Sequence, residues 1–288
     1  MSVIDPARII GGTIYERDIP GVGLLRFEQC GPNEWLTLKG EPAKTTHRCY
    51  RIGDVELDSV SSIVGTLDKP ALLRWYEEQT AIGTRRAANA GELDDTPDED
   101  LVERLKLLNL GASAARDQGA DRGHAIHAVF EAMARGEDPP DPETFPAMAR
   151  PWLRGAMNAW LRMDPEVHIV EGAVVHPSLG YAGRFDLIAT INGRRTLIDY
   201  KTGKGKVYDS AHYQTRLYAM ALACSGIKPV EDIAIVGIDD DGGAQLVHCE
   251  ATWRDALDLV MTFRSRKRIN AGMAAQRKIA KRAAKVAA

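Results

Sequence analysis

The sequence has no long apolar run, few cysteines and no marked excess of either charge. No apolar stretch approaches the roughly 20 residues that cross a bilayer, and the amino terminus lacks the basic start and apolar stretch of a signal peptide. We therefore expect a cytoplasmic protein without a membrane segment. The four cysteines are scattered with no close pair, which favours free thiols in a reducing compartment.

The charge balance excludes one class of nucleic-acid binder. The 288 residues carry 37 Lys and Arg against 40 Asp and Glu, a formal net charge of −3. This balance excludes a histone-like protein whose whole surface is basic, but it allows a local basic channel. Hydrophobic residues make up 44% and charged residues 27%, which are ordinary globular values and exclude global disorder.

The first third of the chain changes its periodicity near residue 60. Residues 1–57 are β-rich, and Gly and Pro turns separate three short candidate strands, Gly12–Tyr15, Gly23–Phe27 and Trp35–Leu38. A helix should begin at Asp68-Lys69-Pro70, because Asp can cap a helix and Pro suits its first turn. Glu92–Asp100 contains six acids and no base, which is typical of a solvated loop.

From residue 116 onward, helices alternate with strands. The expected order is helix 116–135, a helix around Trp152–Leu161, strands 167–175, 184–191 and 195–201, helix 210–224, strands 232–238 and 245–250, and a long helix from Trp253. Asn192-Gly193 joins the second strand of the group to the third, and Asn-Gly is a strong hairpin signal. This order predicts an α/β fold with a mixed central sheet flanked by helices.

Two carboxylates interrupt the apolar sequence of the hairpin strands. Asp186 and Asp199 would be costly on buried strands unless each is paired or binds a metal. The turn at Asn192-Gly193 lays the two strands side by side, so the two acids can converge. A divalent cation would remove their repulsion, and oxygen ligands suit Mg²⁺ or Mn²⁺.

Lys201 follows Asp199 by two residues. Side chains alternate along a strand, so both point the same way, while Tyr200 between them points to the other face, toward the core. An ammonium group beside a metal-binding carboxylate can hold a nucleophilic water or neutralise charge on a phosphate. A plain ion pair is the alternative, but it does not explain Asp186.

Asp186 followed by Asp199-Tyr200-Lys201 resembles the PD-(D/E)XK nuclease superfamily, specifically its RecB-like exonuclease branch with the phage-type exonucleases. Two further motifs of that branch are matched, Gly123-x-x-x-His127 before the strands and Gln214-x-x-x-Tyr218 after them. The resemblance covers roughly residues 59–224. The ordered set is far more specific than Asp-x-Lys alone.

The resemblance implies a restriction-endonuclease-like core and a role for each matched residue. The metal would be held by His127, Asp186, Asp199 and the main-chain carbonyl of Tyr200, with Asp186, Asp199 and Lys201 as the catalytic residues. On the helix of His127, Glu131 is either a surface acid or a residue behind the metal site, and His124 competes with His127 for the ligand role. Some members of the branch hold an iron–sulfur cluster, but here the late cysteines, Cys224 and Cys249, lie far apart, so no cluster is expected.

Local charge favours nucleic acid as the partner. Residues 184–216 contain seven Lys and Arg against three Asp, and the side chains expected to bind substrate are Gln214, Tyr218, Arg184, Lys204 and Lys206. Residues 264–288 carry nine Lys and Arg and no acid. Such a tail either contacts phosphates in a salt-dependent way or is a solvated Ala-rich helix.

The resemblance implies a metal-dependent exonuclease that acts on DNA ends in recombination, repair or phage DNA processing, with a single-strand annealing protein as a plausible partner. Two alternatives stay open: a structure-specific or restriction-type endonuclease on the same core, and a non-catalytic DNA-binding protein that keeps the fold. We divide the chain into a β-rich elaboration (1–57), a nuclease domain (58–263) and a basic helical or disordered tail (264–288). Polarity, strand preference and oligomeric state stay open.

Overall fold

The computed structural model describes residues 8–10, 14–30, 47–53, 55–67, 69–203 and 206–287. The expected strand Trp35–Leu38, the cap by Asp68 and the side chain of Lys204 lie outside these residues. The strands are β1 (Arg8–Ile10), β2 (Ile14–Ile19), β3 (Gly23–Cys30), β4 (His47–Ile52), β5 (Val55–Ser59), β6 (Glu166–His176), β7 (Tyr181–Ile191), β8 (Arg194–Thr202), β9 (Asp232–Ile238) and β10 (Ala244–His248).

Seven α-helices accompany these strands in the described part of the chain. They are α1 (Val60–Val64), α2 (Pro70–Asn89), α3 (Leu101–Leu107), α4 (Gly111–Arg135), α5 (Arg150–Met163), α6 (Asp209–Ala221) and α7 (Trp253–Ala287). The predicted alternation after residue 116 is confirmed, with element ends shifted by a few residues. None of these helices combines the length and the apolar character needed to span a membrane.

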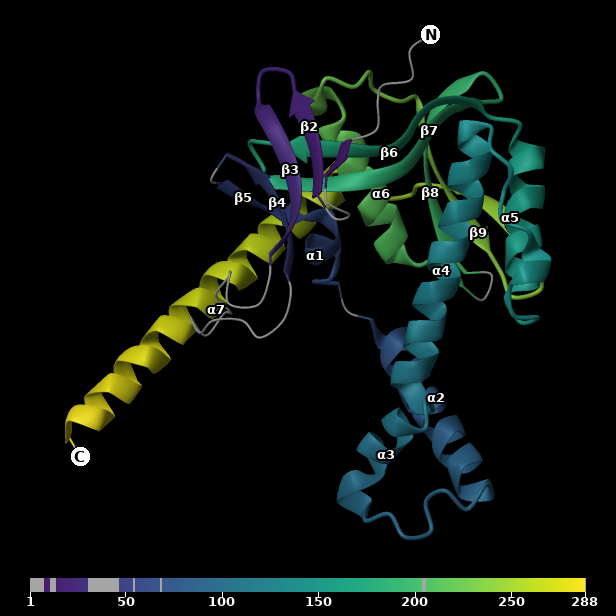
Figure 1. Cartoon of the computed structure of the whole chain (residues 1–288). Coiled ribbons are helices and arrows are strands. Elements are labelled where there is room, and N and C mark those ends of the chain that lie inside the picture. Colours follow the sequence, from purple (N-terminus) through teal and green to yellow (C-terminus); the bar gives the residue numbers. More distant parts are fainter. Residues whose placement is uncertain are drawn as a thin grey trace.

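The described strands join into one mixed sheet. Its order is β1-β2-β3-β4-β5-β7-β8-β9-β10, and β6 pairs with β7 beside this path. The pairs β5–β7 and β8–β9 are parallel, and the other pairs are antiparallel. The mixed sheet with flanking helices confirms the predicted fold class (Figure 1).

Helices cover both faces of the central strands. Apolar side chains of α4 and α5, such as Phe130 and Leu153, pack on one face with Ile198. On the opposite face α1, α6 and α7 form a second core, which includes Leu217 and Val260. Burial of these side chains removes apolar surface from water and holds the three layers together.

The N-terminal strands form a third core against β6 and β7. Ile19 and Leu25 are fully or almost fully buried beside Val175 and Ala182. The parallel pairing of Ser59 with Ala182 then carries the β-rich region into the central sheet. The boundary that we placed at residue 57 therefore falls inside β5.

Turn and cap residues set the ends of the elements that frame the centre. Asn192 and Gly193 have φ of 50° and 76°, so the hairpin turn uses the left-handed region that Asn-Gly favours. Gly136, with φ of 71°, closes α4 through its main-chain N–H. Pro70 occupies the first turn of α2, as the sequence predicts, after Lys69 at the cap position.

Helices α2, α3 and the first half of α4 project from the body as an arm (Figure 1). Gly83 of α2 lies directly against Gly111 of α4, where a Cβ atom on Gly83 would overlap the Gly111 nitrogen. The acidic segment Glu92–Asp100 lies at this arm between α2 and α3, and its acids are exposed. The prediction of a solvated segment there is confirmed.

Candidate metal centre and active site

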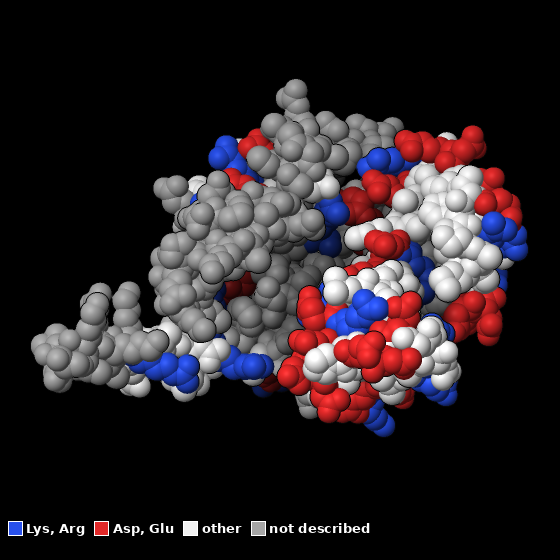
Figure 2. All heavy atoms as spheres, turned by 60° about the horizontal axis from the view of Figure 1, so that its bottom comes forward, with Lys and Arg blue, Asp and Glu red and all other residues white. Residues whose placement is uncertain are grey.

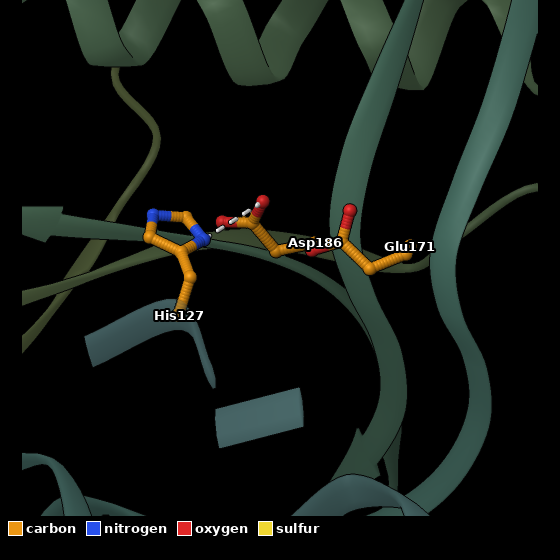
Figure 3. A group of neighbouring side chains, drawn as sticks. All are labelled: His127, Glu171 and Asp186. Carbon is orange, nitrogen blue, oxygen red and sulfur yellow. Dashed lines mark ion pairs between the residues drawn. The ribbon is translucent and has the colours of Figure 1, made fainter. Parts of the chain in front are cut away.

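His127 on α4 and Asp186 on β7 point toward each other (Figure 3). The His127 Nδ1 atom lies 3.5 Å from Asp186 Oδ1. Ile126, Val129 and Phe130 bury the neighbouring face of α4 in the core, so the helix is fixed in rotation. The Gly-x-x-x-His spacing thus places His127, rather than the exposed His124, at the strand carboxylate.

Asp186 also has a structural contact with β8. Its Oδ2 atom accepts a hydrogen bond of 2.7 Å from the Tyr200 main-chain N–H. The main-chain pairing of β7 with β8 begins one residue later, at Leu187 and Ile198. The carboxylate therefore satisfies an N–H of β8 just beyond that pairing, and this bond fixes its orientation.

Glu171 on β6 is a third member of the group that the sequence analysis missed. It has φ of 54°, which is strained for a residue other than glycine, and it interrupts the pairing of β6 with β7 between Val170 and Gly172. Burial, followed by the charge of Asp186, raises the pKa of the Glu171 carboxyl to about 7. An acid inside an apolar strand was the signal that singled out Asp186, and the same signal marks Glu171.

The three side chains can form a metal site. His127, Glu171 and Asp186 each offer a ligand atom, and these atoms lie within 4.8 Å of one another (Figure 3). Two partly buried carboxylates at this separation repel each other, and a bound divalent cation would remove the repulsion. One imidazole and two carboxylates suit a cation such as Mn²⁺ or Mg²⁺.

Asp199 and Lys201 form an ion pair on β8, in which Asp199 is buried and Lys201 is partly exposed. Asp199 is 1% exposed, and its burial raises the pKa of the carboxyl to about 6 although Lys201 opposes the shift. Burial lowers the pKa of Lys201, but the charges of Asp199 and Asp186 outweigh it, so the net shift is upward. Lys201 is therefore an ammonium group at neutral pH, as the predicted role requires.

Asp199 belongs to the same electrostatic group as the metal candidates, since Asp186 and His127 both act on its pKa. Its ligand atoms are outside the group formed by His127, Glu171 and Asp186. Of the predicted ligands, His127 and Asp186 therefore meet in this group, and Glu171 rather than Asp199 is its third member. Tyr200 points into the core as predicted, and its ring stacks on Phe130 with 3.7 Å between centroids.

The Gln214-x-x-x-Tyr218 motif lies on α6, on the other side of the sheet from α4. Gln214 Nε2 donates a hydrogen bond of 2.8 Å to the Tyr218 hydroxyl. Burial raises the pKa of the Tyr218 hydroxyl, and the charge of Asp199 raises it further. The motif therefore lies within electrostatic range of the Asp199–Lys201 pair. The Tyr218 ring packs directly against Gly183 of β7. A side chain at position 183 would block this contact, because its Cβ atom would lie 2.5 Å from Tyr218 Cε1.

The remaining predicted residues have other partners. Arg184, expected at the substrate, places its Nε atom 2.8 Å from Glu171 Oε2. Glu131 pairs with Arg135 at 2.6 Å, although its charge also reaches Glu171. Lys206 lies over the Tyr208 ring, with Nζ 5.9 Å from the centroid.

Comparison with known proteins gives the family to which the chain belongs. Residues 102–282, more than half of the chain, match the sequence profile of the PD-(D/E)XK nuclease superfamily. The chain is therefore a member of that superfamily, and nucleic acid is its class of substrate. No curated protein matches the chain.

Two solved structures resemble the chain at low identity. One is described as the crystal structure of SSO0001, with 14% identity, a TM-score of 0.33, and coverage of 75% of this chain and 74% of that chain. The other is an alkaline exonuclease, LHK-Exo, from Laribacter hongkongensis, with 16% identity, a TM-score of 0.36, and coverage of 77% and 93%. Likenesses of this size carry no argument about activity.

Proposed function

We propose that the protein is a metal-dependent deoxyribonuclease that removes nucleotides from DNA ends. The observation that carries the metal-dependent chemistry is the convergence of His127, Glu171 and Asp186 beside the Asp199–Lys201 pair, and action at DNA ends is what the resemblance to the exonuclease branch implies. In a member of a nuclease superfamily, such a group supplies both the ligands for a divalent cation and a fixed positive charge.

Each side chain has a defined part in the proposed reaction. His127, Asp186 and Glu171 hold Mg²⁺ or Mn²⁺, with Asp199 and the Tyr200 carbonyl as the further ligands predicted from the sequence. The bound cation supplies charge that polarises the scissile phosphate and lowers the pKa of a water molecule. Lys201 positions the attacking water or stabilises the charge that develops on the phosphate, because its ammonium group is held beside Asp199.

The strand to be cut would be bound by α6 and the segment before it. Tyr218 and Gln214 lie near Asp199, and Lys206 lies at the start of this segment. Together with Lys204 and Arg184, they are the candidates for contact with the DNA. An annealing protein that receives the exposed strand is the proposed protein partner, and the cytoplasm is the proposed location.

A digestion experiment tests the proposal. The purified protein is incubated with 5′-labelled and 3′-labelled linear duplex, with single-stranded DNA and with covalently closed circular DNA, each with Mn²⁺ or Mg²⁺. We expect nucleotide release from linear DNA, no release in EDTA, and loss of activity in Asp199→Ala. Asp241→Ala, which removes an exposed acid in the β9–β10 turn, is the control and should retain activity.

The two alternatives give different outcomes in the same experiment. Cleavage of covalently closed circular DNA would identify an endonuclease, because an exonuclease needs an end. Salt-sensitive DNA binding without metal-dependent turnover would identify a non-catalytic DNA-binding protein. Activity that survives EDTA or Asp199→Ala would contradict the mechanism itself.

A further inference from the structure

The N-terminal strands contact the candidate metal centre through Arg184 of β7. The Cζ atom of Arg184 lies 4.7 Å from the centroid of the Tyr15 ring, a cation–π contact with β2. The Nε atom of the same guanidinium lies 2.8 Å from Glu171 Oε2. A continuous series of contacts therefore runs from β2 through Arg184 to Glu171.

A second side chain of β2 fixes the strand beside Glu171. Arg17 follows Tyr15 by two residues, so the two side chains lie on the same face of β2. Arg17 Nη1 donates to the carbonyl of Ala173, two residues after Glu171, and its Nη2 donates to the carbonyl of Ser225 at 3.1 Å. Because Arg17 of β2 is hydrogen-bonded to β6 at Ala173, the Tyr15 ring on β2 has a fixed position relative to Glu171 on β6.

The observed conformation of Glu171 is unfavourable without a stabilising partner. Its φ of 54° is strained for a residue with a Cβ atom. Its carboxylate is partly buried beside Asp186, which repels it. Without Arg184, neither the backbone strain nor this repulsion favours the conformation that places Glu171 beside His127 and Asp186.

We propose that the N-terminal β-layer completes the active site: Tyr15 orients Arg184, and Arg184 positions Glu171 to bind the divalent cation. The inference rests on the proposed function, because it concerns the same metal centre. It also gives residues 14–30 and 47–53 a role, as the layer that presents Tyr15 and Arg17.

Attachment of the layer does not by itself explain the Arg184–Glu171 pair. Ile19, Leu25 and Leu57 already bury their side chains against β6 and β7, which is enough to hold the layer in place. An ion pair that is partly exposed, as Arg184 is here, adds little net stability because water screens the attraction. Orientation of a metal ligand by a charged hydrogen-bond partner is the function that such a pair serves well.

Calorimetric titration of metal-free protein with Mn²⁺ tests the proposal directly. We expect Arg184→Met and Tyr15→Leu each to weaken Mn²⁺ binding, by about 10-fold for Arg184→Met, as for other residues that orient metal ligands. The double variant should be no weaker than Arg184→Met alone, because Tyr15 acts through Arg184. Tyr15→Phe keeps the ring under the guanidinium but removes the hydroxyl that hydrogen-bonds with Arg184, so it should weaken Mn²⁺ binding less than Tyr15→Leu does.

Phe27→Leu is the matched control. Phe27 packs on Tyr15, with 6.0 Å between ring centroids, so its replacement disturbs the same layer without removing a contact to Arg184. It should lower the melting temperature and leave Mn²⁺ affinity unchanged. Arg184→Lys and Tyr15→Phe serve as milder variants if the larger changes prevent folding.

The outcomes separate this inference from the proposed function. Wild-type protein that binds no Mn²⁺ would overturn both. Wild-type binding that is unaltered in Arg184→Met and Tyr15→Leu would overturn the positioning role alone. Additive losses in the double variant would overturn it too, because they would mean that Tyr15 does not act through Arg184.

Discussion

At the scale of single residues, the site contains carboxyl groups whose burial disfavours their charged form. Glu171 and Asp199 are carboxyls with raised pKa values of about 7 and about 6, and burial is the main cause for both. Gly183 is present because the Tyr218 ring occupies the space that a Cβ atom would need. In each case the arrangement lowers the stability of the fold locally but places a side chain where the site requires it.

The raised pKa values predict how stability depends on pH in the metal-free protein. A carboxyl whose folded pKa exceeds its unfolded pKa binds a proton more tightly in the folded state. The free energy of unfolding in EDTA should therefore increase as the pH falls from 8 to 5.5, by a few kcal/mol at most, since one pKa unit is about 1.4 kcal/mol. Urea unfolding at the two pH values measures this.

The double variant Glu171→Gln, Asp199→Asn is the comparison for that experiment. It removes both titrating carboxyls and should have a flatter pH dependence over the same range. Equal pH slopes in the wild type and the variant would show that other groups control the effect.

Gly183→Ala should overpack the contact between β7 and α6. The new methyl group would lie 2.5 Å from Tyr218 Cε1 and 3.0 Å from Val60 Cγ2. We expect the free energy of unfolding to fall by about 1–3 kcal/mol, as for other overpacked cores, and nuclease activity to fall because Tyr218 moves. Urea unfolding and nucleotide release measure the two effects.

Gly119→Ala is the matched control for this change. Gly119 lies within α4, and a Cβ atom there would meet only the Arg122 guanidinium, at 3.8 Å. This substitution should raise stability by up to about 1 kcal/mol, because alanine favours the helix. A stable, fully active Gly183→Ala protein would show that the Tyr218 contact adapts at little cost.

At the scale of elements, the arm depends on one close contact between two helices. Gly83 and Gly111 bring α2 and α4 together where a side chain on Gly83 would overlap main-chain atoms. Around this contact the arm is largely exposed and buries few side chains, among them Ala87, Leu105 and Ala114, so loss of the close approach would weaken its packing. Because α4 also carries His127, the arm and the metal site share one rigid helix.

Gly83→Ala should therefore loosen the arm selectively. We expect hydrogen exchange to become faster in 70–110 and to remain unchanged in β7 and β8, because the contact is local to α2 and α4. Mass spectrometry of exchanged peptides measures this. Faster exchange throughout the sheet would contradict the expectation that the arm opens independently of the core.

At the scale of the whole molecule, charge is divided between separate parts. Outside residues 264–288 the chain has 28 Lys and Arg against 40 acids, while the tail has nine bases and no acid. In Figure 2, acidic side chains gather on the arm and basic side chains follow α7. Near-neutral net charge thus coexists with a strongly basic helix.

The first half of α7 contacts the body of the protein, whereas the second half extends away from it (Figure 1). Lys267 Nζ lies 2.6 Å from Asp58 Oδ1, and Arg266 donates to the carbonyl of Thr66 at 3.3 Å. In the sequence, residues 271–288 carry five further Lys and Arg and no acid, and DNA phosphates would neutralise this charge.

Deletion of residues 271–288 should reduce the salt dependence of DNA binding. The deletion removes five Lys and Arg and leaves the four Lys and Arg of residues 264–268. We expect the slope of log affinity against log salt to decrease in magnitude by about 0.9 for each phosphate that the deleted bases neutralise. Fluorescence anisotropy with labelled duplex measures the slope, and an unchanged slope would mean that the tail is a solvated helix.

The local features of this protein follow from its sequence alone. Apolar periodicity predicts the helices and strands after residue 116, Asn192-Gly193 predicts the hairpin, and the ordered motifs indicate the superfamily. These signals act over short separations, where the spacing of side chains fixes which face each one occupies. Asp186 stands out as an acid within an apolar strand, whereas His127 is identified through the ordered motifs that resemble the superfamily.

Which distant residues meet depends instead on how the layers pack. Glu171 joins the metal group because β6 departs from regular pairing at a left-handed residue, which strand periodicity does not register. Likewise, Arg184 faces Glu171 and Tyr15 rather than solvent, since the N-terminal layer packs on β6. Such contacts join elements that are far apart along the chain, so the roles of Glu171, Arg184 and Tyr15 emerged from the fold and not from the motif.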